Sequence, residues 1–238
     1  PTQVKEAVAS TGDSRWYIIP TGEKYGTLTL LDQHATEEPE HLGSVEVTTY
    51  RLDGDYSDGR RPDSVVFGTS LEEDVKRRDF TVNALAYDPV TETLVDYVNG
   101  QSDLEAKVLT TVGDAADRFK EDGLRVLRAV RFACQLRFEL SMHVQKNLKG
   151  EEYTRHLSAE RVRDELFKIL GSDRAKDGIK TLAAAGVLNV WLPECKAMYA
   201  QEQNMHHAFN VWDHTMEALL LVCVGRESAK SDALLRFT

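Results

Sequence analysis

The chain has 238 residues, of which 42% are hydrophobic and 29% charged, and 29 basic against 39 acidic side chains give it a net charge of −10. These values are typical of one large or two small globular domains, and they exclude a disordered tail, a collagen and a coiled-coil rod. The acidic balance argues against a protein that coats nucleic acid by bulk charge, although it allows a local basic surface. The longest apolar run, Ala218 to Val224, is far shorter than the roughly 20 residues of a membrane helix, so no membrane partner is expected.

The three cysteines, Cys134, Cys195 and Cys223, are widely spaced and form no C-x-x-C pair. No charged-then-apolar leader stands at the start of the sequence. Both observations predict reduced thiols and a cytoplasmic location.

The first half of the chain has the alternating, β-branched runs and the turn residues of an α+β domain. The first two runs are expected to pair antiparallel across a polar loop. Ser70 is expected to cap a helix, with Glu73 as the partner residue of a capping box. The expected elements are strands at Tyr25–Leu31, Ser44–Arg51, Val65–Phe67 and Leu94–Val98, a loop at Leu52–Ser64 and a helix at Ser70–Ala86.

From about Asp114 the pattern becomes helical, with apolar residues from Phe119 to Cys134 recurring at helical spacing. Further helices are expected from Ser158, at Asp177–Ala185 before Gly186, and at Val211–Val224. The expected domains are a partial head at 1–113, a helical neck at 114–195 that binds nucleotide base and RNA, and the start of another helical domain at 196–238.

The most informative stretch of the first half is Arg77–Asp88, RRDFTVNALAYD. Arginine can bind a triphosphate through two parallel hydrogen bonds, and an aspartate can accept hydrogen bonds from ribose hydroxyls. Arg78 and Asp79 are therefore candidates for nucleotide binding. Taken alone, the pattern is more often an ordinary charged helix start.

A second stretch spaces Asp122, Arg125, Arg128 and Arg131 three residues apart on one expected helix. At about 100° per residue, Asp122 and Arg125 would be close neighbours. A carboxylate accepts and a guanidinium donates, which matches the amino donor and ring-nitrogen acceptor on the pairing edges of both cytosine and adenine. Guanine and uracil present the opposite order, so the pair could select C and A. Taken alone, a salt-bridged, solvent-exposed face is the more common explanation.

Three other polar stretches have ordinary explanations. Ser158–Lys168 has the charge spacing of pairs along a helix, so a structural role is expected. Met205–Met216 contains three His and one Asp, which suggests a metal site, although a lone His cluster is more often a surface feature. The Asp residues of Leu52–Ser64 superficially resemble a calcium loop, but their spacing favours a solvated loop.

Taken together, these blocks resemble the class II tRNA nucleotidyltransferases, the CCA-adding enzymes, and their relatives the bacterial poly(A) polymerases. The resemblance is highly specific, because long blocks keep their order over most of residues 1–195. It implies an α+β fold in which an incomplete nucleotidyltransferase-type head, with a mixed or antiparallel sheet, precedes an all-α neck and body. The blocks are YGTLTL at Tyr25, VEVTTYR at Val45, YSDGRRPD at Tyr56, SLEEDVKRRDFTVNALAYDP at Ser70, VDYVNGQSDLEAK at Val95, VGDAADRFKEDGLRVLRAVRFA at Val112 and SAERVRDELFKIL at Ser158.

The resemblance implies a role for each candidate. Arg78 and Asp79 match the motif that holds ribose and triphosphate. Asp122 and Arg125 match the amino-acid template that pairs with the incoming CTP or ATP, and the same binding helix continues through Arg128 and Arg131. The remaining matches are Glu160, Arg161 and Glu165 in a motif that stiffens the neck, and Gly100 and Asp103 in a head–neck hinge motif where Asn99 replaces a first Gly.

The family's catalytic strand carries an Asp-x-Asp pair that binds two Mg²⁺, and in the family it precedes the position matched by Pro1. The resemblance therefore implies an internal fragment that lacks most Mg²⁺ ligands and is inactive alone. Glu46 is the candidate auxiliary catalytic carboxylate, with a solvent-facing strand residue as the alternative. His214 matches the first ligand of an HD-type metal domain found in some members.

The loop Leu52–Ser64 matches a flexible loop that enzymes adding only CC lack as a group. Its candidate residues are Asp58, Arg60 and Arg61.

The implied activity is template-independent addition of CCA to the 3′ end of tRNA from CTP and ATP, with release of pyrophosphate. One alternative is a poly(A) polymerase, which uses the same site without a tRNA end; the acidic composition weakly favours the tRNA enzyme. An alternative of another class is a non-catalytic nucleotide- or RNA-binding remnant.

Overall fold

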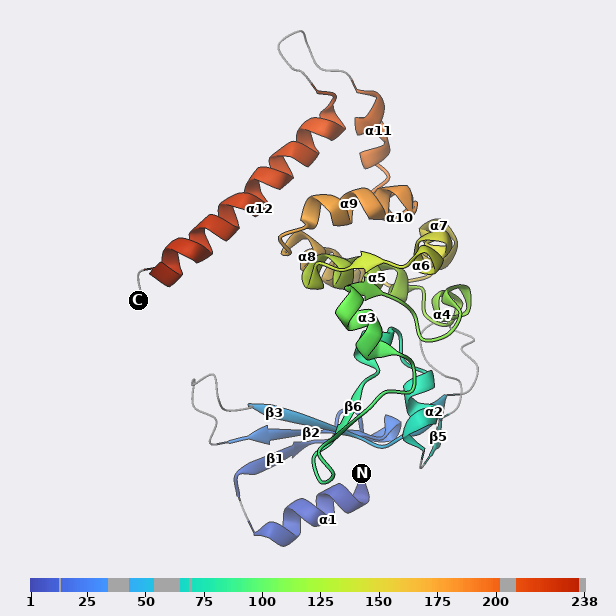
Figure 1. Cartoon of the computed structure of the whole chain (residues 1–238), viewed down its shortest axis with the longest axis vertical. Helices are drawn as coiled ribbons and strands as arrows, with labels where there is room; N and C mark the ends of the chain where they lie inside the picture. The colour runs from blue at the N-terminus through green and yellow to red at the C-terminus, as the bar shows by residue number, and fades with distance from the viewer. Residues whose placement is uncertain (13, 34–42, 54–64, 69, 202–208, 236–238) are drawn as a thin grey trace. The chain divides into compact units, whose positions relative to one another are not determined.

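The computed structural model describes residues 1–235 except 13, 34–42, 54–64, 69 and 202–208. The described residues up to Arg77 form one compact unit, and those from Arg78 onward form a second (Figure 1). The α+β fold is confirmed: the first unit is rich in strands and the second is mainly helical. The organisation into domains at 1–113, 114–195 and 196–238 stays a prediction.

The first unit is built on a three-stranded sheet in the order β1–β2–β3 and a two-stranded sheet of β4 and β5. All of these pairings are antiparallel, as predicted for the β2–β3 pair. The elements are α1 (Thr2–Thr11), β1 (Trp16–Ile19), a short 3-10 helix (Glu23–Tyr25), β2 (Thr27–Asp32), β3 (Ser44–Thr48), β4 (Arg51–Asp53), β5 (Val65–Phe67) and α2 (Leu71–Lys76).

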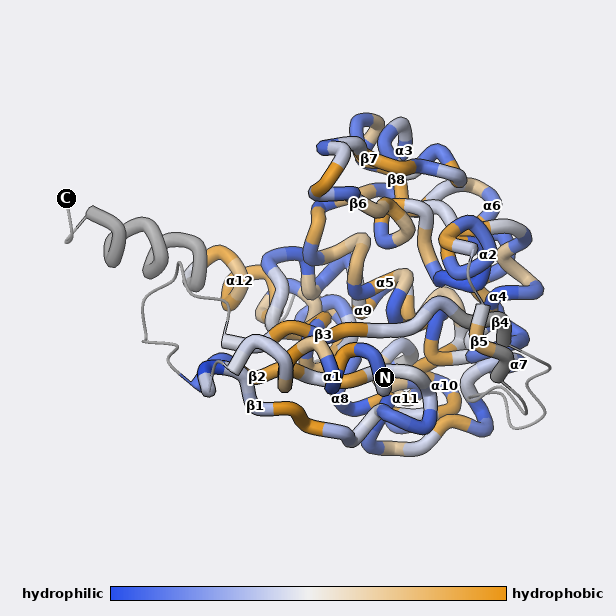
Figure 2. Tube along the Cα trace, turned by 90° about the horizontal axis from the view of Figure 1, so that it is seen from below, coloured by the Kyte–Doolittle hydropathy of each residue, from blue (hydrophilic) through white to orange (hydrophobic). Residues whose placement is uncertain are grey.

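Apolar and polar residues alternate along β3 and most of β2, and Figure 2 shows apolar stretches in β1, β2 and β3. Leu28 is fully buried and lies opposite Val47, while Leu30 lies opposite Val45. These residues share one face because side chains alternate along a strand. Glu46 lies opposite Thr29 on the other, more polar face.

The predicted helix Ser70–Ala86 is correct at its start and wrong in its second half. The Ser70 hydroxyl accepts a hydrogen bond from the backbone N–H of Glu73 at 3.3 Å, but α2 ends at Lys76. Phe80 is fully buried and forms an isolated antiparallel bridge with Thr111. This pairing with a distant segment overrides the local helical pattern.

The described part of the second unit contains one 3-10 helix, two small sheets and the helices α3 to α12. β6 and β7 pair antiparallel, whereas β8 and β9 pair parallel. The elements are η2 (Thr81–Asn83), β6 (Ala86–Asp88), β7 (Thr93–Val95), α3 (Gly100–Ala106), β8 (Val108–Leu109), α4 (Ala115–Glu121), α5 (Leu124–Leu136), β9 (Glu139–Leu140), α6 (Met142–Asn147), α7 (Gly150–Thr154), α8 (Ala159–Leu170), α9 (Ala175–Ala184), α10 (Val187–Trp191), α11 (Cys195–Ala200) and α12 (Val211–Leu235).

Helix α5 is the centre of this unit, and it packs against α8 and α9. Its apolar residues Val126, Leu127 and Val130 are buried, as the helical spacing predicted. Cys134 is also buried, and burial raises the pKa of its thiol to about 11. All three cysteines are free.

Two of the later predicted helices are confirmed with shifted bounds. α9 covers the predicted Asp177–Ala185 helix, and Gly186 follows it with a positive φ of 78°. α12 begins at Val211 as predicted but continues to Leu235. None of the helices in the described part of the chain has the length and apolarity needed to cross a membrane.

Candidate nucleotide-binding site

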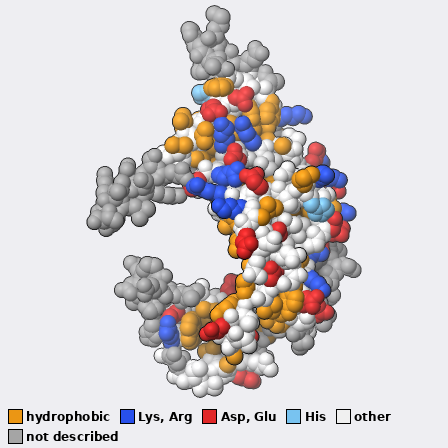
Figure 3. Space-filling model, viewed as in Figure 1, with side chains coloured by type: hydrophobic (Ala, Val, Ile, Leu, Met, Phe, Trp, Pro, Cys, Tyr) orange, Lys and Arg blue, Asp and Glu red, His pale blue; other side chains and the backbone are white. Residues whose placement is uncertain are grey.

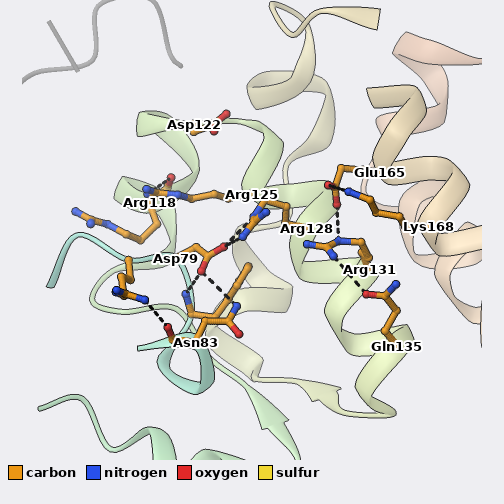
Figure 4. A network of polar contacts seen from close by, with 12 residues as sticks. Asp79, Asn83, Arg118, Asp122, Arg125, Arg128, Arg131, Gln135, Glu165 and Lys168 are labelled. Carbon is orange, nitrogen blue, oxygen red and sulfur yellow. Dashed lines mark hydrogen bonds and ion pairs between the residues drawn. The ribbon is translucent and has the colours of Figure 1, made fainter. Parts of the chain in front are cut away.

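The turn that follows α2 carries Arg78 and Asp79, the two candidates for ribose and triphosphate binding. Asp79 Oδ2 accepts hydrogen bonds from Nε and Nη2 of Arg128 at 2.8 and 2.5 Å (Figure 4). Asp79 Oδ1 accepts from the backbone N–H of Phe80 at 2.9 Å and from the Asn83 amide at 3.4 Å. Arg78 is exposed and donates to the Asn83 carbonyl at 3.1 Å. The structure therefore brings Asp79 and Arg128 together across 49 residues of sequence.

Asp122 lies between two helices, which corrects the prediction of one continuous helix through Phe119–Phe132. α4 ends just before Asp122, whose backbone is extended with φ −146° and ψ 105°, and α5 begins after Gly123. A Cβ on Gly123 would lie 1.9 Å from the carbonyl oxygen of Tyr153. The backbones of two helical segments thus approach at a distance that only glycine permits, and the wheel angle predicted between Asp122 and Arg125 does not apply.

The carboxylate of Asp122 is held from two sides. Oδ1 accepts a hydrogen bond from the backbone N–H of Leu124, the first residue of α5, at 3.0 Å. Oδ2 accepts a hydrogen bond from Nη2 of Arg161 on α8 at 2.7 Å. The Arg125 N–H also donates to the Asp122 carbonyl at 2.9 Å, so the two template candidates remain neighbours across one turn.

Arg125 is buried to 9% exposure, which is unusual for a charged side chain. Its Nη1 donates to a carboxylate oxygen of Glu121 at 2.5 Å and to the Arg118 carbonyl at 3.1 Å. Glu121 also forms an ion pair with the Arg118 guanidinium. The guanidinium of Arg125 is thus positioned by α4, whereas the carboxylate of Asp122 is positioned by α8.

Arg128 and Arg131 follow on the next turn of α5. The guanidinium carbons of Arg128 and Arg131 lie 5.3 and 4.0 Å from the ring centroid of Phe132. Arg131 Nε lies 2.6 Å from a carboxylate oxygen of Glu165, and its Nη1 donates to Gln135 at 3.3 Å (Figure 4). Arg128 therefore contacts the nucleotide candidate Asp79, while Arg131 contacts the neck helix α8.

Helix α8 contributes two charged residues four positions apart, Arg161 and Glu165. Arg161 forms an ion pair with Asp122, and Glu165 forms one with Arg131. All four side chains are at most 20% exposed. Glu160, the third residue matched to the neck motif, is exposed. Figure 3 shows the same charge pattern more widely, because basic and acidic side chains lie next to one another over α8 and α9. The two ion pairs support the structural role expected for this stretch.

The expected hinge segment has a tightly specified backbone. Asn99 is in the left-handed region, with φ 61° and ψ 31°, which Asn tolerates better than most residues. A Cβ on Gly100 would lie 2.3 Å from the Thr81 carbonyl oxygen, and Asp103 accepts the Thr81 hydroxyl proton at 2.6 Å. Burial acts to raise the pKa of Asp96, but backbone N–H groups, including that of Gly100, outweigh it and lower the pKa.

The remaining candidates stand on other elements or outside the described residues. Glu46 is exposed on β3, and no three His, Cys, Asp or Glu side chains within the described ranges come together as a metal site. The described side chains therefore do not form a two-Mg²⁺ site. His214 is exposed on the first turn of α12, and its backbone N–H donates to Asn210. The loop candidates Asp58, Arg60 and Arg61 lie outside the described residues.

Chemically, the cluster offers guanidinium donors whose charges are balanced by carboxylates. Such groups can exchange a carboxylate partner for a phosphate or a base edge, because both present acceptors to the same N–H groups. Four residues of this cluster are not among those that the sequence predicted for the site: Asn83, Arg118, Glu121 and Phe132. Glu121 could have been found from its position four residues before Arg125, the spacing of an ion pair along a helix.

Comparison with known proteins finds two protein-family models that match parts of the chain. Residues 1–110 match the model of the poly A polymerase head domain, and residues 147–199 match a probable RNA- and SrmB-binding site of polymerase A. The CCA-adding enzyme of Geobacillus thermodenitrificans is 44% identical over 177 residues, 74% of this chain and 41% of that protein. The CCA-adding enzyme of Bacillus velezensis is 36% identical over 225 residues, 92% of this chain and 54% of that protein.

The solved structures that resemble this chain include enzymes of the same kind. The Bacillus stearothermophilus CCA-adding enzyme in complex with CTP matches with a TM-score of 0.61 and 36% identity, over 72% of this chain and 39% of that chain. A tRNA nucleotidyltransferase complexed with a primer tRNA and an incoming ATP analogue matches with a TM-score of 0.60 and 27% identity, over 85% of this chain and 52% of that chain. The chain thus spans about half the length of the relatives it matches. It belongs to the family of tRNA nucleotidyltransferases and bacterial poly(A) polymerases.

Proposed function

We propose that the protein adds CCA to the 3′ end of tRNA from CTP and ATP, without a nucleic-acid template and with release of pyrophosphate. Its partners are then the tRNA 3′ end and nucleoside triphosphates, and its place of action is the cytoplasm. The observation that carries the proposal is the pair Asp122 and Arg125, an acceptor and a donor that are neighbours across one turn and are held by separate helices. The names of the relatives favour CCA addition over poly(A) addition.

In this proposal the residues of the chain select and bind the nucleotide. Asp122 accepts from the amino group of cytosine or adenine, and Arg125 donates to the ring nitrogen beside it. Asp79 accepts from ribose hydroxyls, while Arg78 and Arg128 donate to phosphate oxygens. Arg131 keeps α5 against α8 through Glu165.

Magnesium belongs to the proposal as the family's metal, which activates the tRNA 3′ hydroxyl for attack on the α-phosphate when bound. The residues that the structure describes do not form a site for it, so no step is assigned to it on this chain. Glu46 stays a candidate auxiliary carboxylate, and its exposed position on the polar face of the sheet leaves it accessible. His214 stays a candidate ligand for a separate HD-type site.

The test uses the full gene product and a tRNA transcript that ends just before CCA. We expect incorporation of labelled CTP and then ATP, rejection of UTP and GTP, and no extension of a control tRNA that already ends in CCA. Long A tails on an unrelated RNA with ATP alone would identify a poly(A) polymerase instead. Saturable nucleotide binding without any incorporation would identify a non-catalytic binding protein.

A further inference from the structure

The ring of Phe132 lies at the centre of the arginine cluster on α5. The guanidinium carbons of Arg131 and Arg128 lie 4.0 and 5.3 Å from its centroid. A guanidinium over a ring face is attracted by the negative potential of that face. One phenyl ring therefore contacts two successive cations of the candidate site.

The ring of Phe132 also packs against the ring of Phe80. The two ring centroids are 5.7 Å apart with an interplanar angle of 75°, an edge-to-face arrangement, and Phe80 is fully buried. Phe80 directly follows Asp79, which accepts two hydrogen bonds from Arg128. The turn after α2 and helix α5 are thus joined by two adjacent contacts, the Asp79–Arg128 ion pair and the Phe80–Phe132 ring contact.

The two kinds of contact can use different parts of one guanidinium group. Stacking uses the flat face of a guanidinium, whereas hydrogen bonds use the N–H groups on its edge. The edge of Arg128 is bound to Asp79, the group that would engage the ribose. If the Asp79 carboxylate accepts hydrogen bonds from a ribose, it can no longer give all of its acceptor capacity to Arg128. A contact with the Phe132 ring would still hold Arg128 in place, and its N–H groups could then donate to a phosphate.

We propose that Phe132 is a positioning residue that holds the face of Arg128 over its ring, so that the guanidinium edge can pass from Asp79 to a nucleotide phosphate. The inference rests on the proposed function, because it takes Arg128 as a phosphate-binding residue. Arg131 differs, since its edge is committed to Glu165 and Gln135. The effect of the ring on nucleotide binding therefore passes through Arg128.

The experiment measures KM and kcat for CTP and for ATP in the full-length protein. Phe132→Met conserves volume but removes the ring face, and we expect KM to rise about five-fold for both nucleotides, the scale of one cation–π contact. We expect kcat to stay within about two-fold, because the reacting atoms are untouched. Phe132→Tyr keeps the face and should restore KM, and Phe132→Leu is a second ringless variant should the Met variant not fold.

The matched control is Phe119→Met, which removes a fully buried ring whose centroid lies 6.0 Å from that of Tyr153 and over which, among the described residues, no cation is placed. It should lower the melting temperature and leave KM unchanged. In an Arg128→Lys background, where the flat cation is absent, Phe132→Met should change KM by less than about two-fold. Equal KM effects of the two Phe→Met changes, or an undiminished effect in the Arg128→Lys background, would overturn the inference.

If the wild-type protein incorporates no nucleotide, the proposed function fails by itself. The role of Phe132 is then judged by equilibrium dialysis with labelled CTP on the same variants. A Kd that rises about five-fold in Phe132→Met and recovers in Phe132→Tyr supports the inference, and an unchanged Kd overturns it.

Discussion

At the scale of single residues, the site depends on the two oxygens of the Asp122 carboxylate. Each oxygen already accepts one hydrogen bond, from Leu124 and from Arg161. An oxygen has two lone pairs, so both can accept another donor without losing the contact that orients them. This geometry suits a group that must present an acceptor to a base in a fixed direction.

We expect Asp122→Ala in the full-length protein to relax discrimination of CTP and ATP against UTP and GTP by about 1–3 kcal/mol, the scale of a bidentate base contact. The measurement is kcat/KM for each of the four nucleotides. The control is Asp164→Ala, an exposed acidic residue on α8 that should leave discrimination unchanged. Unchanged discrimination in Asp122→Ala would end the template interpretation.

Gly123 is the residue that allows the turn beside Asp122. Gly123→Ala should reduce the free energy of unfolding by about 1–3 kcal/mol, because the new methyl group overlaps the Tyr153 carbonyl and the backbone must move. Denaturant unfolding measures this loss. Gly225→Ala is the comparison, since a Cβ there meets nothing within 4 Å on helix α12, and it should be neutral or stabilising. Equal stability of both variants would show that the junction is not tight.

At the scale of elements, α8 connects to the site through Arg161–Asp122 and Glu165–Arg131. We expect Arg161→Gln to reduce the free energy of unfolding by about 1–2 kcal/mol, because it leaves a mostly buried carboxylate with a weaker partner. It should also weaken base discrimination, measured as kcat/KM ratios, since Asp122 loses its orientation. Arg163 on the same helix is exposed and paired with its neighbour Asp164, so Arg163→Gln should change neither the free energy of unfolding nor base discrimination. If Arg161→Gln and Arg163→Gln had the same stability and the same base discrimination, α8 would not position Asp122.

The start of α4 gives a pH-dependent prediction. The Asp114 carboxylate accepts the backbone N–H of Asp117 and of Ala116, and these hydrogen bonds lower its pKa. A group whose pKa is lower in the folded state stabilises the fold above its ordinary pKa and loses that contribution as the pH falls through the folded value. Asp114→Asn keeps a capping acceptor but cannot titrate, so its melting temperature should fall less steeply between about pH 5 and pH 3 than that of the wild type. Parallel curves would contradict the prediction.

At the scale of the whole molecule, the proposed CCA addition requires that CTP and ATP be bound in turn, although their bases differ in size. By its sequence, the segment Leu52–Ser64 matches the loop that enzymes adding only CC lack as a group, and its residues 54–64 lie outside the described part of the chain. We expect deletion of residues 53–61 from a full-length protein to spare CC addition and abolish addition of the terminal A. The measurement is product length on tRNA transcripts that end before CCA and after CC. Equal loss of both steps would make the loop structural, and no loss would make it dispensable.

The sequence by itself determined the features that depend on neighbouring residues. The β2–β3 hairpin, the Ser70 cap, the buried stripe of α5 and the existence of α9 all follow from alternation, helical spacing or a cap residue. The candidate nucleotide residues also came from the sequence, because the order of its motifs carried the resemblance.

Tertiary structure alone decided where helices break and which charges meet. Helix α2 stops at Lys76 because Phe80 pairs with Thr111, and the helix predicted through Asp122 breaks where Gly123 meets Tyr153. The contacts of Asp79 with Arg128 and of Asp122 with Arg161 join residues 49 and 39 positions apart. Apart from proline, residues differ in helix propensity by at most about 1 kcal/mol each. Burial of an aromatic ring or a close backbone contact outweighs a difference of that size. Both depend on residues that are distant in the sequence, so no local pattern encodes them.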